Sequence, residues 1–227
     1  MTLENFDVAR ERMVREQVAA CGITDRRVLR ALLRIPRHRF LGREAGTEAY
    51  ADHSLPIGFS QTMSKPYMVA YLAQELALEG EESVLEIGTG SGYQAAVLSM
   101  LARTVHTIER IGELSAKAQT VFGELGIRNV YTRVGDGASG WREMAPFHRI
   151  LLTAAAEEVP QHLLTQLADG GFLLGPVVVD GEQQQVAKLT RRGNRFVVER
   201  LGPCSFVRLI RFPNEAVTSG DIRNTDS

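Results

Sequence analysis

Apolar residues in the first forty positions recur at the three- and four-residue spacing of an amphipathic helix. The apolar members of the two stripes are Met13, Val14, Val18 and Cys21, followed by Val28, Leu29, Leu32 and Leu33. The second stripe begins after Asp25, a residue that can cap a helix, and ends before Pro36, which cannot continue one. The pattern predicts two N-terminal helices with these apolar residues buried.

From residue 83 onward, short apolar runs alternate with helical patterns. The expected strands are Ser83–Ile87, Thr104–Glu109, Asn129–Val134 and Arg149–Thr153, and the expected helices are 92–102, 111–125 and 160–167. Such alternation is typical of a parallel sheet covered by helices on both faces.

After Gly170-Gly171 the pattern changes to strands alone. The expected strands are Phe172–Val179, Gln185–Arg191, Arg195–Leu201 and Ser205–Ile210, and Gly193-Asn194 is a two-residue hairpin turn. The sequence therefore predicts an α/β fold whose central sheet is mostly parallel and whose C-terminal strands are antiparallel.

Two segments interrupt this regular pattern. Residues 41–64 have no clear period and form a loop much longer than usual, which is typical of a functional loop or lid. A helix follows from Lys65-Pro66, where the serine before Lys65 can act as a cap. We expect one domain over residues 1–210, with 1–64 packed on it, and a flexible tail over 211–227.

Composition limits the function classes. The chain has 227 residues, is 44% hydrophobic and has a formal net charge of −1, which argues against a disordered chain and against a strongly basic nucleic-acid binder. The two cysteines, Cys21 and Cys204, form no metal-binding pair, and we expect them to be buried. The five histidines form no cluster, so no metal is expected. We find no signal peptide and no transmembrane run, and we expect a soluble cytoplasmic protein.

The segment after the first expected strand of the sheet carries the most chemical information. It reads Glu86-Ile-Gly88-Thr-Gly90-Ser91-Gly92 and lies between that strand and a helix. Glycines at this place let a ligand lie against bare backbone. The G-x-G-x-G spacing differs from the pyrophosphate-binding G-x-G-x-x-G, and the acid Glu86 suits a cationic ligand better than a phosphate.

The next two strands end in acids at the same edge of the sheet. Glu109 closes Thr104–Glu109, where a carboxylate can accept both hydroxyls of an adenosine ribose. Gly135-Asp136-Gly137 follows Asn129–Val134. Each feature alone is weak, since strand ends often carry solvated acids and turns, but three at one edge indicate a binding site.

Together these residues resemble the S-adenosylmethionine-dependent methyltransferases of the Rossmann-like, three-layer type. That resemblance implies S-adenosyl-L-methionine as cofactor, with S-adenosyl-L-homocysteine as product. The segment Leu55-Pro-Ile-Gly-Phe-Ser-Gln-Thr-Met-Ser-Lys-Pro-Tyr-Met68 resembles more narrowly the protein-L-isoaspartate O-methyltransferases, which typically read P-I-G-x-G-Q-T-I-S-x-P-x-M. The similarity extends over roughly residues 8–210.

By position, the resemblance implies a role for each matching residue. Ser64 corresponds to the active-site serine of the family, although a plain helix cap is the alternative. The implied cofactor-binding residues are Gly88, Gly90, Ser91, Glu109, Asp136 and Gly137. The implied substrate-binding residues are Gln61, Thr62, Phe206 and Val207. Ser60, Met63, Ala156 and Arg208 depart from the family pattern, and Arg208 is expected either to meet a peptide carboxylate or, preferably, to face solvent.

The implied reaction is methyl transfer to the free α-carboxylate of an L-isoaspartyl residue in damaged proteins and peptides, which starts repair through a succinimide. Such a carboxyl titrates near pH 3.5 and needs no strong general base, so orientation is the main task. Two alternatives stay open: a methyltransferase for another small-molecule or carboxyl substrate, and a non-catalytic cofactor-binding module. A monomer that binds neither nucleic acid nor membrane is expected.

Overall fold

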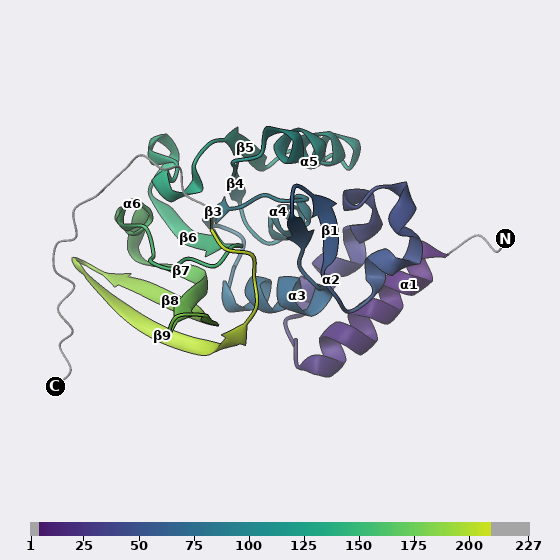
Figure 1. Ribbon diagram of the computed structural model, residues 1–227, viewed down its shortest axis with the longest axis horizontal. Coiled ribbons are helices and arrows are strands. Elements are labelled where there is room, and N and C mark those ends of the chain that lie inside the picture. Colours follow the sequence, from purple (N-terminus) through teal and green to yellow (C-terminus); the bar gives the residue numbers. More distant parts are fainter. Residues whose placement is uncertain (1–4, 210–227) are drawn as a thin grey trace.

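The central feature of the computed structural model is a seven-stranded sheet of order β5-β4-β3-β6-β7-β8-β9 (Figure 1). The structure describes residues 5–209, except for the side chains of Arg43 and Glu44, so the expected tail at 211–227 lies outside the described residues. The strands are β3 Ser83–Ile87, β4 Thr104–Glu109, β5 Val130–Val134, β6 Phe147–Leu152, β7 Leu167–Val179, β8 Gln183–Arg192 and β9 Arg195–Cys204.

Pairing within the sheet follows the predicted change of pattern. Strands β5, β4, β3, β6 and β7 run parallel to their neighbours, whereas β7–β8 and β8–β9 are antiparallel. All five residues of β3 are buried, as expected for a central parallel strand covered on both faces. The predicted fold class, with a mostly parallel sheet and an antiparallel C-terminal part, is confirmed.

Two apolar clusters occupy the two faces of the sheet. On one face Val84, Val105 and Leu151 pack with the helices α3 (Pro66–Glu75), α4 (Tyr93–Ser99) and α5 (Gly112–Glu124). On the other, Leu85 and Ile150 pack against α6 (Gln161–Thr165). Neighbouring strand residues alternate between the clusters because successive side chains of a strand point to opposite faces. The result is a three-layer arrangement.

The N-terminal helices join the larger cluster beside α3 (Figure 1). They are α1 (Phe6–Arg12), which continues as a π-helix over Met13–Val18 and a 3-10 turn over Ala19–Cys21, and α2 (Arg26–Arg34), capped by Asp25. Within the described residues, these helices and the sheet therefore share one apolar core.

Two expected burials in these helices are wrong. Cys21 is exposed and Leu33 is 36% exposed, while Met13, Val14 and Val18 are buried as predicted. The wider π-helical turn changes the helical phase, which rotates Cys21 away from the apolar stripe. The second cysteine, Cys204, is only half-buried.

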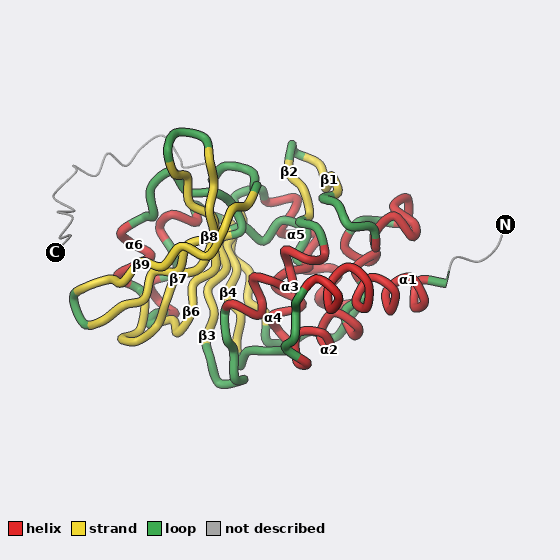
Figure 2. The backbone as a smooth tube through the Cα atoms, turned by 90° about the horizontal axis from the view of Figure 1, so that it is seen from below, coloured by secondary structure: helices red, strands yellow, loops and turns green. Residues whose placement is uncertain are grey.

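The segment 41–64 is more ordered than its sequence suggests. It contains a 3-10 segment over Arg43–Tyr50 and the antiparallel hairpin of β1 (Leu55–Gly58) and β2 (Gln61–Met63). Figure 2 shows this hairpin standing apart from the seven-stranded sheet. The hairpin turn places Phe59 and Ser60 at φ of 55° and 58°, in the left-handed region.

The expected strand Ser205–Ile210 is wrong for the described residues 205–209. That segment forms only an isolated bridge between Arg208 and Ala155. The preceding strand, β9, continues to Cys204, after which the chain crosses the open edge of the sheet. The backbone groups of residues 205–209 bond instead to the loop residue Ala155 and to the side chain of Gln184. These residues therefore do not form a further strand of the sheet.

Candidate active site

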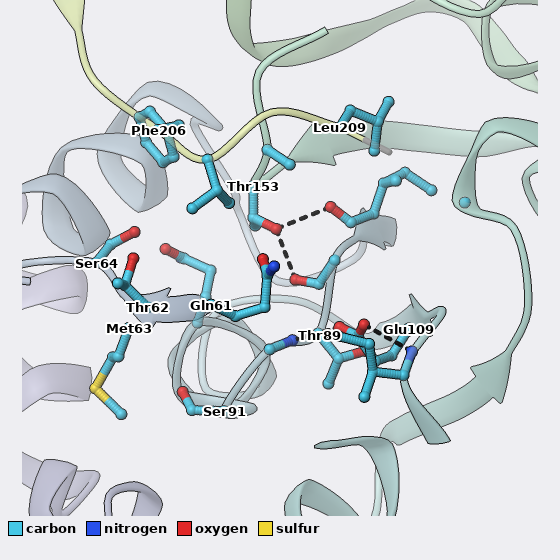
Figure 3. A pocket seen from close by; sticks show the side chains of 18 of the residues that line it. Gln61, Thr62, Met63, Ser64, Thr89, Ser91, Glu109, Thr153, Phe206 and Leu209 are labelled. Carbon is cyan, nitrogen blue, oxygen red and sulfur yellow. Dashed lines mark hydrogen bonds between the residues drawn. The ribbon is translucent and has the colours of Figure 1, made fainter. Parts of the chain in front are cut away.

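A single cavity brings together ten of the eleven residues predicted for catalysis or binding. It lies where the parallel strands end and is lined by loops after β3, β4 and β6, by the segment after β1, and by residues 206–209 (Figure 3). The predicted residues in its lining are Gln61, Thr62, Ser64, Gly88, Gly90, Ser91, Glu109, Gly137, Phe206 and Val207. Ligands of open α/β sheets bind at this edge.

Asp136 is the exception. Its carboxylate accepts a hydrogen bond of 2.9 Å from the backbone N–H of Ala138 and caps the 3-10 turn Gly137–Ser139, and the residue is absent from the cavity lining. Gly137 does line the cavity, and a Cβ there would come within 2.4 Å of Ile87 Cγ2. Gly137, rather than the side chain of Asp136, therefore faces the cavity after β5.

We call the strand-end loops 88–91, 109–111 and 153–154 the cavity floor. At Gly88, φ is +99° and a Cβ would lie 2.4 Å from Thr153 Oγ1. That hydroxyl is itself 2.8 Å from the carbonyl oxygen of Ile87 and 2.6 Å from that of Gly88. Thr153 was not among the predicted site residues, although its place directly after an apolar strand at the same edge is a signal for it.

Glu109 ties two floor loops together. One carboxylate oxygen accepts from Gly90 N–H at 2.8 Å and the other from Ile111 N–H at 3.0 Å. A carboxylate offers about four lone-pair positions, so two acceptor positions are left for ligand hydroxyls. Since Gly90 belongs to the glycine loop, the acid both shapes that loop and stays available to a ligand.

Glu86 lies below the floor rather than in the cavity. It is fully buried, and its Oε2 accepts from Thr107 Oγ1 at 2.6 Å, while Thr107 Oγ1 lies 2.7 Å from Thr89 Oγ1. Burial raises the pKa of Glu86 to about 8, with a further contribution from the charge of Glu109. Glu86 is therefore a buried and mostly protonated group beneath the glycine loop, and it does not line the cavity itself.

We call residues 55–64 and 205–209 the cavity cover. Ser64 directly follows β2, and its hydroxyl points toward the cavity in Figure 3. Lys65, and not Ser64, is the N-cap of α3, and no side chain caps that helix. The alternative interpretation of Ser64 as a helix cap is therefore wrong, and its hydroxyl is not used by the helix.

The second part of the cover, residues 205–209, is held by a few specific bonds. The side-chain amide of Gln184 donates to Phe206 O at 3.0 Å and accepts from Phe206 N–H at 2.7 Å. Ala155 exchanges two backbone bonds of 2.8 Å with Val207 and Leu209. Arg208 lines the cavity, and its side chain is 48% exposed, in line with the preferred expectation that it faces solvent. It is paired there with Glu157.

A mostly parallel sheet with a glycine loop after β3, an acid at the end of β4 and a cavity at the shared edge defines the class of S-adenosylmethionine-dependent methyltransferases with a Rossmann-like fold. The sequence profile described as protein-L-isoaspartate(D-aspartate) O-methyltransferase matches residues 9–212. The chain belongs to this family.

Individual relatives agree with that assignment. The chain is 50% identical over 208 residues to "Protein-L-isoaspartate O-methyltransferase 2" of Geotalea uraniireducens, covering 91% of this chain and 95% of the relative. It is 47% identical over 206 residues to the protein-L-isoaspartate O-methyltransferase of Geobacter metallireducens, with 91% and 95% covered.

Two solved structures are similar in fold. One, a protein-L-isoaspartate O-methyltransferase, has a TM-score of 0.81 and 28% identity, and the match covers 88% of this chain and 65% of the other. The second, from Plasmodium falciparum, has a TM-score of 0.78 and 23% identity, with 88% and 98% covered. The overall fold is thus shared with these two solved structures.

The residues of the floor fit the cofactor of this class. At Gly90 a Cβ would lie 3.5 Å from Ile57 of the hairpin, so its bare backbone leaves room for a close approach between floor and cover, whereas the space at Gly88 is taken by Thr153. Glu109 retains acceptor capacity for ribose hydroxyls, and Ile108 and Ile111 add apolar lining. S-adenosyl-L-methionine is the cofactor that this donor set accommodates.

Other kinds of site find no support in the described part of the chain. Within residues 5–209, no three His, Cys, Asp or Glu side chains are grouped so that they could hold a metal ion. The same residues include no helix with both the length and the apolar character needed to cross a bilayer.

Proposed function

We propose that this chain transfers the methyl group of S-adenosyl-L-methionine to the free α-carboxylate of L-isoaspartyl residues in damaged proteins and peptides, and that Ser64 positions the acceptor. The backbone nitrogen of the following residue then attacks the methyl ester, which closes a succinimide and releases methanol. Hydrolysis of that ring returns part of the residue to normal aspartate. The observation that carries the proposal is the single cavity in which the glycine loop and Glu109 lie opposite Ser64 and residues 206–207.

The acceptor chemistry matches the groups that line the cavity. An α-carboxylate has a pKa near 3.5 and is ionised at neutral pH, so the protein need not remove a proton from it. The lining offers hydroxyl and amide groups from Gln61, Thr62 and Ser64, and no histidine among the described residues. Hydrogen-bond donors that hold a carboxylate in place are what this reaction requires.

Ser64 is the hydroxyl best placed for this task. When bound, the cofactor supplies an electrophilic methyl group on a sulfonium centre. Ser64 donates a hydrogen bond to one carboxylate oxygen of the acceptor and directs the other toward that methyl group, while Gln61 and Thr62 shape the rim. Phe206 and Val207 cover the acceptor and exclude water, which favours a step in which an anion and a cation become neutral.

A peptide assay tests the proposal. Purified protein with labelled cofactor is expected to methylate an isoaspartyl peptide and to leave the matched aspartyl peptide unmodified. Ser64→Ala is expected to lower kcat/KM by roughly 10- to 100-fold, because a hydrogen bond to a charged group is lost. Ser54→Ala, an exposed serine outside the cavity lining, is the control and is expected to keep kcat/KM.

Other outcomes identify the alternatives. Methylation of a different carboxyl or small molecule, with none of the isoaspartyl peptide, would indicate another substrate on the same scaffold. Thermal stabilisation by S-adenosyl-L-homocysteine without transfer to any acceptor would indicate a cofactor-binding module. Full activity of Ser64→Ala would remove only the role given to Ser64.

The proposal extends to the working state of the protein. We place it in the cytoplasm as a monomer whose partners are isoaspartyl-containing proteins, with no nucleic acid or membrane involved. The near-zero net charge supports the exclusion of nucleic acid and membrane, because a nucleic acid or an anionic bilayer attracts strongly basic surfaces. Light scattering of the purified protein at several concentrations tests the monomer, and cell fractionation tests the compartment.

A further inference from the structure

Arg37 is a fully buried arginine that contacts the backbone of Ser64 in the cavity cover. It begins the 3-10 turn Arg37–Phe40 and has no exposed surface. Its Nε donates to the carbonyl oxygen of Ala49 and its Nη2 to the carbonyl oxygen of Ser64, both at 2.7 Å. Its guanidinium carbon lies 5.0 Å from the ring centre of Tyr93.

No carboxylate among the described residues forms an ion pair with this charge, and Asp52 acts on it only through a longer-range attraction. The Nη1 of Arg37 is buried with no hydrogen-bond acceptor among those residues. Desolvation lowers the pKa of Arg37 to about 10, which leaves it protonated at neutral pH. Burying an unpaired charge is costly, so a residue of this kind calls for an explanation beyond packing.

The first contact that accounts for the buried Arg37 is its hydrogen bond to the carbonyl oxygen of Ser64. β2 ends at Met63 and α3 has its N-cap at Lys65, so Ser64 lies between a strand and a helix. Among the described residues, its carbonyl oxygen accepts from Arg37 and from no backbone N–H. Fixing this carbonyl fixes the peptide plane after Ser64, and with it the direction of a residue held by no regular structure.

The second contact of Arg37 is with the ring of Tyr93. Tyr93 follows the glycine loop as the first residue of α4, is buried, and lines the same cavity as Ser64. Arg37 contacts both the Ser64 carbonyl and the Tyr93 ring. It therefore connects the cavity cover to α4, the helix that directly follows the glycine loop of the floor. Ala49 adds a third attachment from the 3-10 segment Arg43–Tyr50.

We propose that Arg37 is a positioning residue for methyl transfer: it holds the Ser64 backbone, and so directs the Ser64 hydroxyl toward the acceptor carboxylate, without touching the substrate itself. This rests on the proposed function, in which Ser64 contacts the acceptor. The prediction that follows is energetic coupling between Arg37 and Ser64, because removing Arg37 can damage catalysis only while Ser64 is present to be misplaced.

A double-mutant cycle tests the coupling. With the isoaspartyl peptide, Arg37→Met is expected to lower kcat/KM by about 10- to 100-fold in the native background, similar to Ser64→Ala, and by less than about 3-fold in the Ser64→Ala background. Binding of S-adenosyl-L-homocysteine is expected to change less than about 3-fold. Arg37→Lys, which keeps the charge and can reach one carbonyl, is expected to recover part of the activity.

Arg27 provides a matched control. It is a partly buried arginine that also bridges two backbone carbonyls, those of Leu78 at 2.5 Å and Leu101 at 3.1 Å, and it does not line the cavity. Arg27→Met is expected to lower the melting temperature while kcat/KM of the folded protein stays within about 2-fold. Amide hydrogen exchange of the segment after β2 is expected to speed up in Arg37→Lys and to be unchanged in Arg27→Met.

Several results would overturn the proposal. Equal losses from Arg37→Met or Arg37→Lys in both Ser64 backgrounds would mean that Arg37 acts independently of Ser64. A matching loss of cofactor binding would mean a general structural role. If Arg37→Met does not fold, the same cycle with Arg37→Lys decides. An inactive native protein that still binds cofactor would reject the proposed function, whereas faster exchange after β2 in Arg37→Lys would still report on the positioning contact.

Discussion

The floor and the cover of the cavity are built in different ways. Floor residues directly follow strands whose register is set by the sheet, and the groups beneath them are buried, such as Glu86 and Thr107 with no exposed surface. The cover consists of a hairpin and a bridging segment outside the sheet, and Phe59 at the hairpin tip is 49% exposed. Individual side chains, Arg37 and Gln184, hold it in place.

This difference separates two tasks. The floor presents backbone and one carboxylate to a cofactor whose shape is constant, so a rigid edge set by many strand contacts suits it. The cover meets peptides of different sequence, and a segment held by a few hydrogen bonds can open without unfolding the sheet. Changes in the floor should therefore affect cofactor binding and stability together, while changes in the cover should leave cofactor binding intact, and those that loosen its contacts around the acceptor should affect peptide kinetics.

The largest effect is expected from Gly88→Ala in the floor. The new Cβ would lie 2.4 Å from Thr153 Oγ1 at a φ of +99°, so strain and overlap together should cost about 2–4 kcal/mol of unfolding free energy. Binding of S-adenosyl-L-homocysteine, measured by calorimetry, should be lost. Gly112→Ala, where nothing lies within 4 Å and φ is not positive, should stay within about 1 kcal/mol. Undiminished cofactor binding by Gly88→Ala would contradict the rigid floor.

Next is the pH dependence that Glu86 gives to the floor. Its pKa is about 8 in the folded protein and 4.5 in the reference state, so the native state binds the extra proton between these values. The unfolding free energy should therefore fall as pH rises from about 5 to 8, by at most about 1.4 kcal/mol per pH unit.

Glu86→Gln should remove that slope, since an amide does not titrate. Denaturant unfolding of both proteins at pH 5, 6, 7 and 8 provides the measurement, with Glu199→Gln, an exposed glutamate on β9, as the control that keeps the native slope. Parallel curves for the native protein and Glu86→Gln would show that Glu86 is ionised throughout, contrary to its burial.

A smaller effect is expected in the cover from Gln184→Ala. Loss of its two hydrogen bonds to Phe206, worth about 1 kcal/mol each at most, should loosen residues 205–209 and raise KM for the isoaspartyl peptide about 5- to 10-fold. Cofactor affinity should stay within about 2-fold. Gln183→Ala, exposed and one residue earlier on β8, should leave both values unchanged. A parallel loss of cofactor affinity would erase the distinction between cover and floor.

The smallest effect belongs to Ser60 at the hairpin turn. Ser60 stands where the family usually has glycine, and it adopts a φ of +58°, which costs a non-glycine residue about 1 kcal/mol. Ser60→Gly should raise the melting temperature by a few degrees at most, as seen by calorimetry, with peptide KM within about 2-fold. Ser54→Gly, whose φ is not positive, should instead lower stability slightly. A large change in KM on Ser60→Gly would mean that the turn itself contacts substrate.

Most of the sheet could be predicted from the sequence, because buried parallel strands are short apolar runs that end in glycines or acids. β3 and β4 begin and end at the predicted residues. The predictions failed where a local pattern competes with tertiary context: Cys21 follows a π-helical turn, and residues 205–209 look like a strand but bond to Ala155 and Gln184.

In the site, residues that belong to a local sequence motif could be predicted from the sequence. Contacts between residues far apart in the sequence could not. The glycine loop, Glu109 and the segment ending at Ser64 were identified from residue type and spacing, since each is a local feature. Thr153 packing on Gly88, the burial of Glu86 and the bond from Arg37 to the Ser64 carbonyl join residues far apart in the sequence. Only the folded chain brings such partners within hydrogen-bond distance, because no local rule specifies which distant residues meet.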